Sequence, residues 1–198
     1  FRTPPAVTLL TSDLLQFGTL PNNRPEPMEP IETEYQGYRF RSRLEARWAV
    51  IFDWLDVGWK YEPQGFDLPS TGRYLPDFLL PGFEAILAQT TPKRASGLWI
   101  EVKGGEPGKS ERAKSRELAR ESDLPVAIVC GVGEDATSFL YPHRGRQPME
   151  STTVNILSYI TAHNFRDTVF TACLEAEDAL ERGRSARFEH GEKGAGGG

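Results

Sequence analysis

Hydrophobic residues recur at helical spacing in one segment near the start of the chain. Four apolar side chains fall three or four positions apart, namely Leu44, Trp48, Ile51 and Leu55. Because this spacing places them on one face of a helix, and Gly58 follows as a stop signal, we expect a helix over about residues 43 to 56. The preceding YQGYRFR, residues 35 to 41, alternates aromatic and basic residues and predicts a short strand.

Several later segments have the composition of β-strands. They are WKYEPQGFDL and GRYLPDFLL, joined by a turn at PSTG, and the β-branched and aromatic run LWIEVKG at residues 98 to 104. A charged segment with few apolar anchors, residues 109 to 122, predicts a second helix. The wholly apolar PVAIVCG, residues 125 to 131, predicts a buried strand. From about residue 152 to 182 the pattern is helical again.

The predicted order is a helix, three strands, a helix and a strand, followed by a C-terminal helical extension. Such an order is typical of a mixed sheet flanked by helices, which is an α/β domain. We divide the chain into a Pro-rich N-terminal arm (1 to 34), the α/β core (35 to 150), the helical extension (151 to 190) and a flexible Gly-rich tail (191 to 198).

Composition narrows the classes of protein to consider. With 198 residues, of which 38% are hydrophobic, the chain can form one ordinary globular core. A formal net charge of -5 means that a nucleic-acid role would need a concentrated basic face. The 2 cysteines are too few for a disulfide framework or a four-thiolate metal site, so we expect a reducing, cytoplasmic compartment. Since no apolar run approaches the roughly 18 to 20 residues of a membrane span, we expect no membrane association.

Two of the predicted strands carry charged residues where an unpaired ion would be costly. Asp77 lies within RYLPDFLL, and both Glu101 and Lys103 lie within LWIEVKG. Because side chains alternate between faces along a strand, Glu101 and Lys103 point the same way. If the two strands are neighbours, Asp77 and Glu101 can converge on one divalent cation, and such hard oxygen ligands suit Mg²⁺ or Mn²⁺. Lys103 would then orient a water nucleophile or stabilise a phosphate.

The sequences LPDF, IEVKG and the upstream RSRLEARW together resemble the PD-(D/E)xK nuclease superfamily. Within it, they are most similar to small phage and actinobacterial proteins. Pro76 and Asp77 match the Pro-Asp element, Glu101 and Lys103 match the E-x-K element, and Glu45 matches the glutamate of the preceding helix. The resemblance implies a restriction-endonuclease-like fold with an α-β-β-β-α-β core, in agreement with the order predicted from the hydrophobic pattern.

The resemblance also implies a function and a cofactor. It implies a divalent-metal-dependent nuclease that hydrolyses phosphodiester bonds, with DNA as the expected substrate and RNA left open. Asp77, Glu101 and the Val102 carbonyl would hold Mg²⁺ or Mn²⁺, with Glu45 assisting directly or through water. Double-strand cleavage would require a homodimer, a larger nucleoprotein assembly or two successive nicks.

Each element of this pattern has an ordinary structural explanation as well. Ser42 and Glu45 fit the S-x-x-E capping box at the start of a helix. Asp77 could end a strand, and Glu101 with Lys103 could be a solvent-facing pair. We favour the metal site because the combination is specific although each element is weak. The alternative function is a catalytically inactive nucleic-acid-binding or assembly module that retains the fold.

Four arginines near the start of the first predicted helix form a candidate nucleic-acid-binding set, namely Arg39, Arg41, Arg43 and Arg47. Aromatic residues are interleaved with them, and such a group can neutralise phosphates and stack on bases. The charged helix over residues 109 to 122 is interpreted instead as a solvated face, with Glu111 and Glu117 as partners of its basic residues. Glu62 and Asp67 are expected to be ordinary surface or turn residues.

Overall fold

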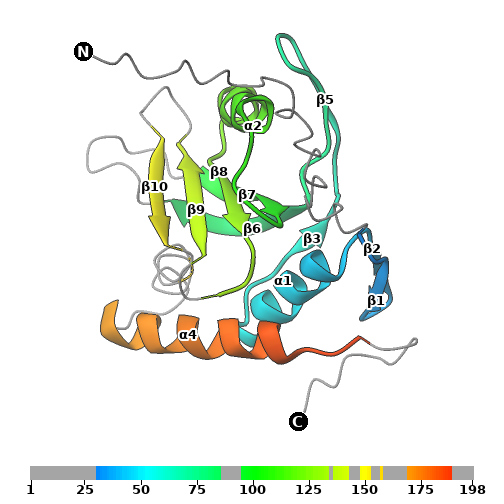
Figure 1. Ribbon diagram of the computed structural model, residues 1–198. Coiled ribbons are helices and arrows are strands. Elements are labelled where there is room, and N and C mark those ends of the chain that lie inside the picture. The colour runs from blue at the N-terminus through cyan, green and yellow to red at the C-terminus, as the bar shows by residue number, and fades with distance from the viewer. Residues whose placement is uncertain are drawn as a thin grey trace, which may run out of the picture.

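A six-stranded mixed sheet forms the centre of the protein. The computed structural model describes residues 30–85, 95–133, 136–142, 148–152, 157 and 169–188. The strands lie in the order β10-β9-β8-β7-β6-β3 (Figure 1). They are β3 (Lys60–Tyr61), β6 (Phe78–Ala85), β7 (Ala95–Lys103), β8 (Val126–Cys130), β9 (Thr137–Tyr141) and β10 (Met149–Thr152). The strands β7 and β8 are parallel and the other neighbours are antiparallel.

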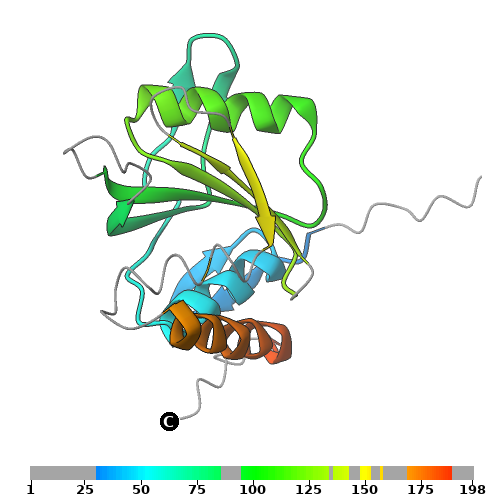
Figure 2. The same ribbon diagram turned by 90° about the vertical axis from the view of Figure 1, so that its left-hand side faces the viewer.

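Helices cover both faces of this sheet, so the predicted α/β class with a mixed sheet is confirmed. Helices α1 (Arg43–Trp54) and α4 (Val169–Ser185) lie on one face, and α2 (Lys109–Glu121) lies on the other (Figure 2). The parallel pairing of β7 with β8 needs a crossover connection, which α2 provides. Two small hairpins accompany the sheet: β1 (Thr33–Tyr35) with β2 (Tyr38–Phe40), and β4 (Phe66–Leu68) with β5 (Gly72–Tyr74).

The alternation of side chains along β7 assigns each residue of IEVKG to one face. Ile100 and Val102 belong to the core shared with α1 and α4. Trp99 belongs to the second core, which α2 covers, so Glu101 and Lys103 project toward α2. Because Phe78 pairs with Ile100 across the β6–β7 ladder, Asp77, which directly precedes β6, lies opposite Glu101. The register therefore places the predicted site at one end of two adjacent strands.

The first helix forms where the apolar spacing predicted it. Ser42 is its N-cap, and its hydroxyl accepts a hydrogen bond from the Glu45 backbone N–H at 3.2 Å. Trp48 and Ile51 are completely buried in the core. The Trp48 indole N–H also donates to the Gly131 carbonyl at 3.2 Å, which ties α1 to the end of β8. The position of Glu45 is thus fixed by both a cap and a packed helix face.

The C-terminal part is helical in α4, as expected, but not at residues 151 and 152. These two residues end β10, and β9 is a strand that the pattern did not predict. Residues 153–156 and 158–168 of the expected extension lie outside the described residues. Helix α4 packs against α1, and its Ala179 and Leu180 are completely buried in the main core. Most of the Pro-rich arm and all of the Gly-rich tail lie outside the described residues. Within the described ranges, no helix combines the length and apolar character needed to span a bilayer.

Two leucines of α4 test whether this helix belongs to the folding unit. Leu180 is completely buried, whereas Leu174 is 51% exposed. We expect Leu180→Ala to lower the free energy of unfolding by about 2–5 kcal/mol, because it leaves a cavity between the helices. The matched variant Leu174→Ala should change it by less than about 0.5 kcal/mol. Urea unfolding followed by circular dichroism measures both, and equal effects would contradict this packing.

Candidate functional site

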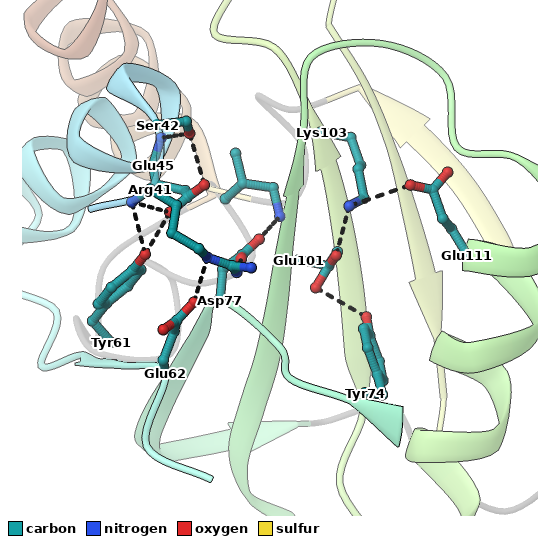
Figure 3. Close-up of polar contacts among 11 residues, drawn as sticks. Arg41, Ser42, Glu45, Tyr61, Glu62, Tyr74, Asp77, Glu101, Lys103 and Glu111 are labelled. Carbon is teal, nitrogen blue, oxygen red and sulfur yellow. Dashed lines mark hydrogen bonds and ion pairs between the residues drawn. The ribbon is translucent and has the colours of Figure 1, made fainter. Parts of the chain in front are cut away.

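Asp77 occupies the centre of a polar cluster at the end of the β6–β7 pair. Its carboxylate is buried, with 3% of the residue exposed. One oxygen, Oδ2, accepts a hydrogen bond from the Val102 backbone N–H at 2.7 Å, and Oδ1 lies 2.7 Å from Nη2 of Arg41 (Figure 3). The first contact continues the β6–β7 pairing through a side chain, beyond the last backbone pair. Asp77 therefore contacts both the backbone of β7 and the guanidinium group of Arg41.

Glu101 and Lys103 lie on the neighbouring strand and form an ion pair. The distance between Lys103 Nζ and Glu101 Oε1 is 2.7 Å, and Glu111 of α2 lies 3.2 Å from the same ammonium group. The other oxygen of Glu101 accepts a hydrogen bond from the Tyr74 hydroxyl at 3.1 Å. Glu101 is buried, with 6% exposed, so these contacts compensate for its loss of hydration. The E-x-K pair is thus not a solvent-facing pair on an edge strand.

Glu45 combines the cap with a place in the cluster. Its Oε1 accepts a hydrogen bond from the Ser42 hydroxyl at 2.7 Å. Its Oε2 accepts from the Tyr61 hydroxyl at 2.7 Å and from the Arg41 backbone N–H at 3.2 Å. The charge of Glu45 also acts on Asp77. Glu45 is therefore close to the other carboxylates, while its own oxygens are bonded to protein donors.

The charges of Glu101 and Glu45 act on the buried carboxylate of Asp77. Burial and the neighbouring charge of Glu101 raise the pKa of Asp77 to about 8, although the Val102 N–H and the Arg41 guanidinium act in the opposite direction. Burial by itself would lower the pKa of Lys103, but the charges and hydrogen bonds of Glu101 and Glu111 outweigh it and raise this pKa. Lys103 is consequently a cation at neutral pH, and the cluster as a whole favours added positive charge.

The donor set fits Mg²⁺ better than it fits a metal held by many protein ligands. Among the described residues, no group of three or more His, Cys, Asp and Glu side chains is arranged to hold a metal ion. Mg²⁺ needs only one or two carboxylates, because it keeps several waters and accepts phosphate oxygens. Asp77 and Glu101 supply two such groups on adjacent strands. The N–H and the C=O of one strand residue point toward the same neighbouring strand. Because the Val102 N–H donates to Asp77, the Val102 carbonyl lies on the same side of β7 as Asp77.

The four arginines of the predicted nucleic-acid-binding set lie in different surroundings. Arg41 pairs with Asp77 and, through its Nε at 2.5 Å, with Glu62. Arg39 is exposed and forms an ion pair with Glu32. Arg43 and Arg47 line a pocket together with residues that follow α4. Only Arg41 of this set reaches the carboxylates.

Several residues of the cluster were not predicted from the sequence. Glu62 was expected to be an ordinary surface residue, but its backbone N–H donates to the Asp77 carbonyl at 2.8 Å and its carboxylate pairs with Arg41. Tyr61 and Tyr74 contact the two glutamates. No sequence signal identifies these residues, because the short β3 and the β4–β5 hairpin bring them into place through pairing with distant segments.

The expectation that Glu117 is part of a solvated helix face was wrong. It is buried, and its two oxygens accept hydrogen bonds from the Ser70 N–H at 2.8 Å and the Thr71 hydroxyl at 2.6 Å. These bonds attach the β4–β5 turn to α2 and so position Tyr74, the partner of Glu101. Asp67, by contrast, is exposed as expected, and its carboxylate lies 3.5 Å from the Arg73 guanidinium.

Comparison of the chain with known protein families, with curated protein sequences and with solved structures found no match.

The raised pKa of Asp77 makes the stability of the metal-free protein depend on pH. The folded protein holds this proton up to about pH 8, whereas an unfolded chain releases it near ~4. Because the folded state binds more protons between these values, the free energy of unfolding falls as the pH rises through this range. Asp77→Asn cannot titrate and keeps an acceptor for the Val102 N–H. We expect the free energy of unfolding of this variant to decrease with pH by less than that of the unsubstituted protein, the difference being on the order of 3 kcal/mol.

Urea unfolding in EDTA between pH 5 and pH 9 measures this difference. The control is Asp67→Asn, which removes an exposed carboxylate of the neighbouring hairpin. Its pH profile should follow that of the unsubstituted protein. Parallel profiles for Asp77→Asn and the unsubstituted protein would contradict the assigned burial and repulsion.

Proposed function

We propose that this protein is a divalent-metal-dependent nuclease that hydrolyses phosphodiester bonds, with DNA as its substrate. One observation carries the proposal: two buried carboxylates, Asp77 and Glu101, lie at the end of adjacent strands, and Lys103 follows two positions after Glu101 on the same face. This arrangement provides hard anionic ligands beside a fixed cation. Hydrolysis of a phosphodiester needs such groups, because negative charge develops on the phosphate oxygens in the transition state.

Asp77, Glu101 and the carbonyl of Val102 would hold Mg²⁺ or Mn²⁺. Glu45 would assist through water, because its oxygens already accept hydrogen bonds from Ser42, Tyr61 and Arg41. When bound, the cation would supply a Lewis acid beside the phosphate and a lower pKa for water at the site. The same charge would relieve the repulsion that raises the pKa of Asp77.

Lys103 and Arg41 have separate roles in this proposal. The ammonium group of Lys103 is held between Glu101 and Glu111, so it can orient a water for attack and stabilise negative charge on the phosphate. Arg41 has a side chain that is 56% exposed although its guanidinium reaches Asp77. When a metal ion takes the place of Arg41 at Asp77, the Arg41 guanidinium can therefore bind a phosphate oxygen instead.

The order of elements supports a restriction-endonuclease-like topology as part of the proposal. When the β4–β5 hairpin is set aside, the succession α1, β3, β6, β7, α2 and β8 follows the α-β-β-β-α-β order of the PD-(D/E)xK superfamily. Asp77 directly before β6, Glu101 and Lys103 on β7, and Glu45 on α1 correspond to the motif positions of that order. Cleavage of both strands would involve a homodimer or two successive nicks.

One observation favours the second candidate, an inactive nucleic-acid-binding module that retains the fold. Asp77 and Glu101 already contact Arg41 and Lys103, at 2.7 Å each, without any metal. A cluster that is satisfied in this way can stabilise a fold and need not catalyse a reaction. Metal binding and turnover distinguish the two candidates.

Metal binding should raise the melting temperature of the protein. At a Mg²⁺ or Mn²⁺ concentration about 100 times the Kd, we expect a stabilisation of roughly 2.7 kcal/mol, which is on the order of 5 °C for a chain of this size. Asp77→Ala and Glu101→Gln should remove this increase, because each deletes one of the two anionic ligands. Asp67→Asn should retain it, and a Na⁺ series controls for ionic strength. An equal increase in all variants would indicate unspecific ion binding.

Cleavage of labelled DNA should depend on the same residues. Lys103→Ala is expected to lower the single-turnover rate by about 10²–10⁴-fold, because it removes the group that orients the nucleophile and stabilises charge. The matched control is Lys109→Ala, since Lys109 is an exposed lysine at the start of α2. The substrates are single-stranded, duplex and branched DNA and the equivalent RNA, each with Mg²⁺ and with Mn²⁺. Unchanged cleavage in Lys103→Ala, or none by the unsubstituted protein on any substrate, would refute the nuclease proposal.

A further inference from the structure

Four arginines converge on a pocket that is separate from the carboxylate cluster. The pocket has a volume of about 370 Å³ and is lined by Arg43 and Arg47 of α1 and by Arg184, Arg187 and Phe188 from the end of α4 and the residues after it. Ser185 and Ala186 complete the lining. Two segments far apart in the sequence therefore contribute two arginines each.

The close approach of α4 to α1 builds this pocket. Gly183 allows the approach, because a Cβ at this position would lie 2.6 Å from the side chain of Ile51 and 3.2 Å from the Arg47 carbonyl. After the helix, Phe188 is buried and its ring meets that of Tyr35 edge-on, with centroids 6.1 Å apart. The segment that carries Arg184 and Arg187 is thus attached at both ends to the domain.

Two of the four arginines in the pocket have a buried N–H without an acceptor among the described residues. Arg184 forms an ion pair with Glu181. The Nε atoms of Arg43 and Arg47 are buried, and neither has a hydrogen-bond acceptor among the described residues. A buried donor without an acceptor is costly, and in a site with four guanidinium groups an anion is the acceptor that fits. Guanidinium groups match the geometry of phosphate, to which they bind with paired hydrogen bonds.

We propose that this pocket binds backbone phosphates of the nucleic acid at a distance from the bond that is cut. This inference rests on the proposed function, because the pocket and the carboxylate cluster share α1. Arg43 and Glu45 are two positions apart near the start of that helix, and so they project to different sides of it. A strand whose scissile phosphate lies at Asp77 would pass the N-terminal end of α1 and reach the arginines. The pocket then fixes the position of the substrate without reading its sequence.

Substitution of the exposed arginines tests the pocket with little risk to the fold. Arg184→Gln and Arg187→Gln, singly and together, alter exposed residues at and beyond the end of α4. Binding of fluorescein-labelled single-stranded and duplex DNA is measured by anisotropy in EDTA, which prevents metal-dependent cleavage. We expect each substitution to weaken binding by about fivefold to tenfold and to reduce the salt dependence by about one phosphate contact. Melting curves verify that the variants fold.

The matched control is Arg182→Gln, which makes the same charge change on the same helix. Arg182 stacks on Trp54, with its guanidinium 4.3 Å from the ring centroid, and does not line the pocket. This variant should bind DNA within about twofold of the unsubstituted protein. Equal losses in Arg182→Gln and Arg187→Gln would mean that only net charge matters, and this result would overturn the proposal.

Cleavage and phosphate binding, measured in parallel, separate this inference from the proposed function. If the unsubstituted protein cleaves DNA and the double variant binds and cleaves equally well, the pocket proposal fails while the nuclease stands. If no substrate is cleaved but DNA binding requires Arg184 and Arg187, the pocket stands while the nuclease fails. Pyrophosphate is the third probe. If it raises the melting temperature through these arginines while DNA binding ignores them, the pocket binds a small phosphorylated ligand and the nucleic-acid assignment is overturned.

Discussion

The hydrogen bond between the Asp77 carboxylate and the Val102 backbone N–H is the contact on which the site depends. It continues the β6–β7 pairing beyond the last backbone partners, so a side chain takes the place of a strand residue. This hydrogen bond holds Asp77 beside Glu101, so two acidic groups share a buried position. Burial and repulsion there raise the pKa of Asp77 to about 8. The surrounding structure compensates for this cost with Arg41 on one side and Lys103 on the other. The two cations of the cluster therefore lie at its two buried strand carboxylates.

Residues from both faces of the sheet contact the charged groups of this cluster. From the α1 side, Arg41 and Tyr61 contact Glu45, and Glu62 contacts Arg41. From the α2 side, Glu111 contacts Lys103, and Glu117 fixes the hairpin that supplies Tyr74. Such a network stabilises the folded state only while each charge has a partner, since an unpaired ion in a buried site is strongly unfavourable. Under the proposed function, a divalent cation at Asp77 and Glu101 would compete with Arg41 and Lys103 for the same carboxylate oxygens.

Helix α1 connects the two polar regions of the protein. Because an α-helix turns by about 100° per residue, Arg43 and Arg47 share one side while Glu45 lies on another. One side meets the end of α4 at the arginine pocket, and the other meets the carboxylates. The buried apolar face of α1, with Trp48 and Ile51, fixes the helix between these sites. Helix α4 consequently shares one hydrophobic core with α1 and the sheet, although the sequence pattern separates them.

The sequence by itself determined the elements with strong local periodicity and the residues that these elements carry. Apolar spacing identified α1, β-branched content identified β7 and β8, and alternation put Glu101 and Lys103 on one face. Only the tertiary structure decided which charged side chains contact one another. The sequence predicted Glu117 to be a solvated residue, but it is a buried partner of the β4–β5 turn, and no pattern indicated that Arg41 contacts Asp77. Strands β9 and β10 and the packing of α4 were decided there too. The physical reason is that periodicity describes one element at a time, whereas partners of a charge depend on the register and approach of segments far apart in the chain.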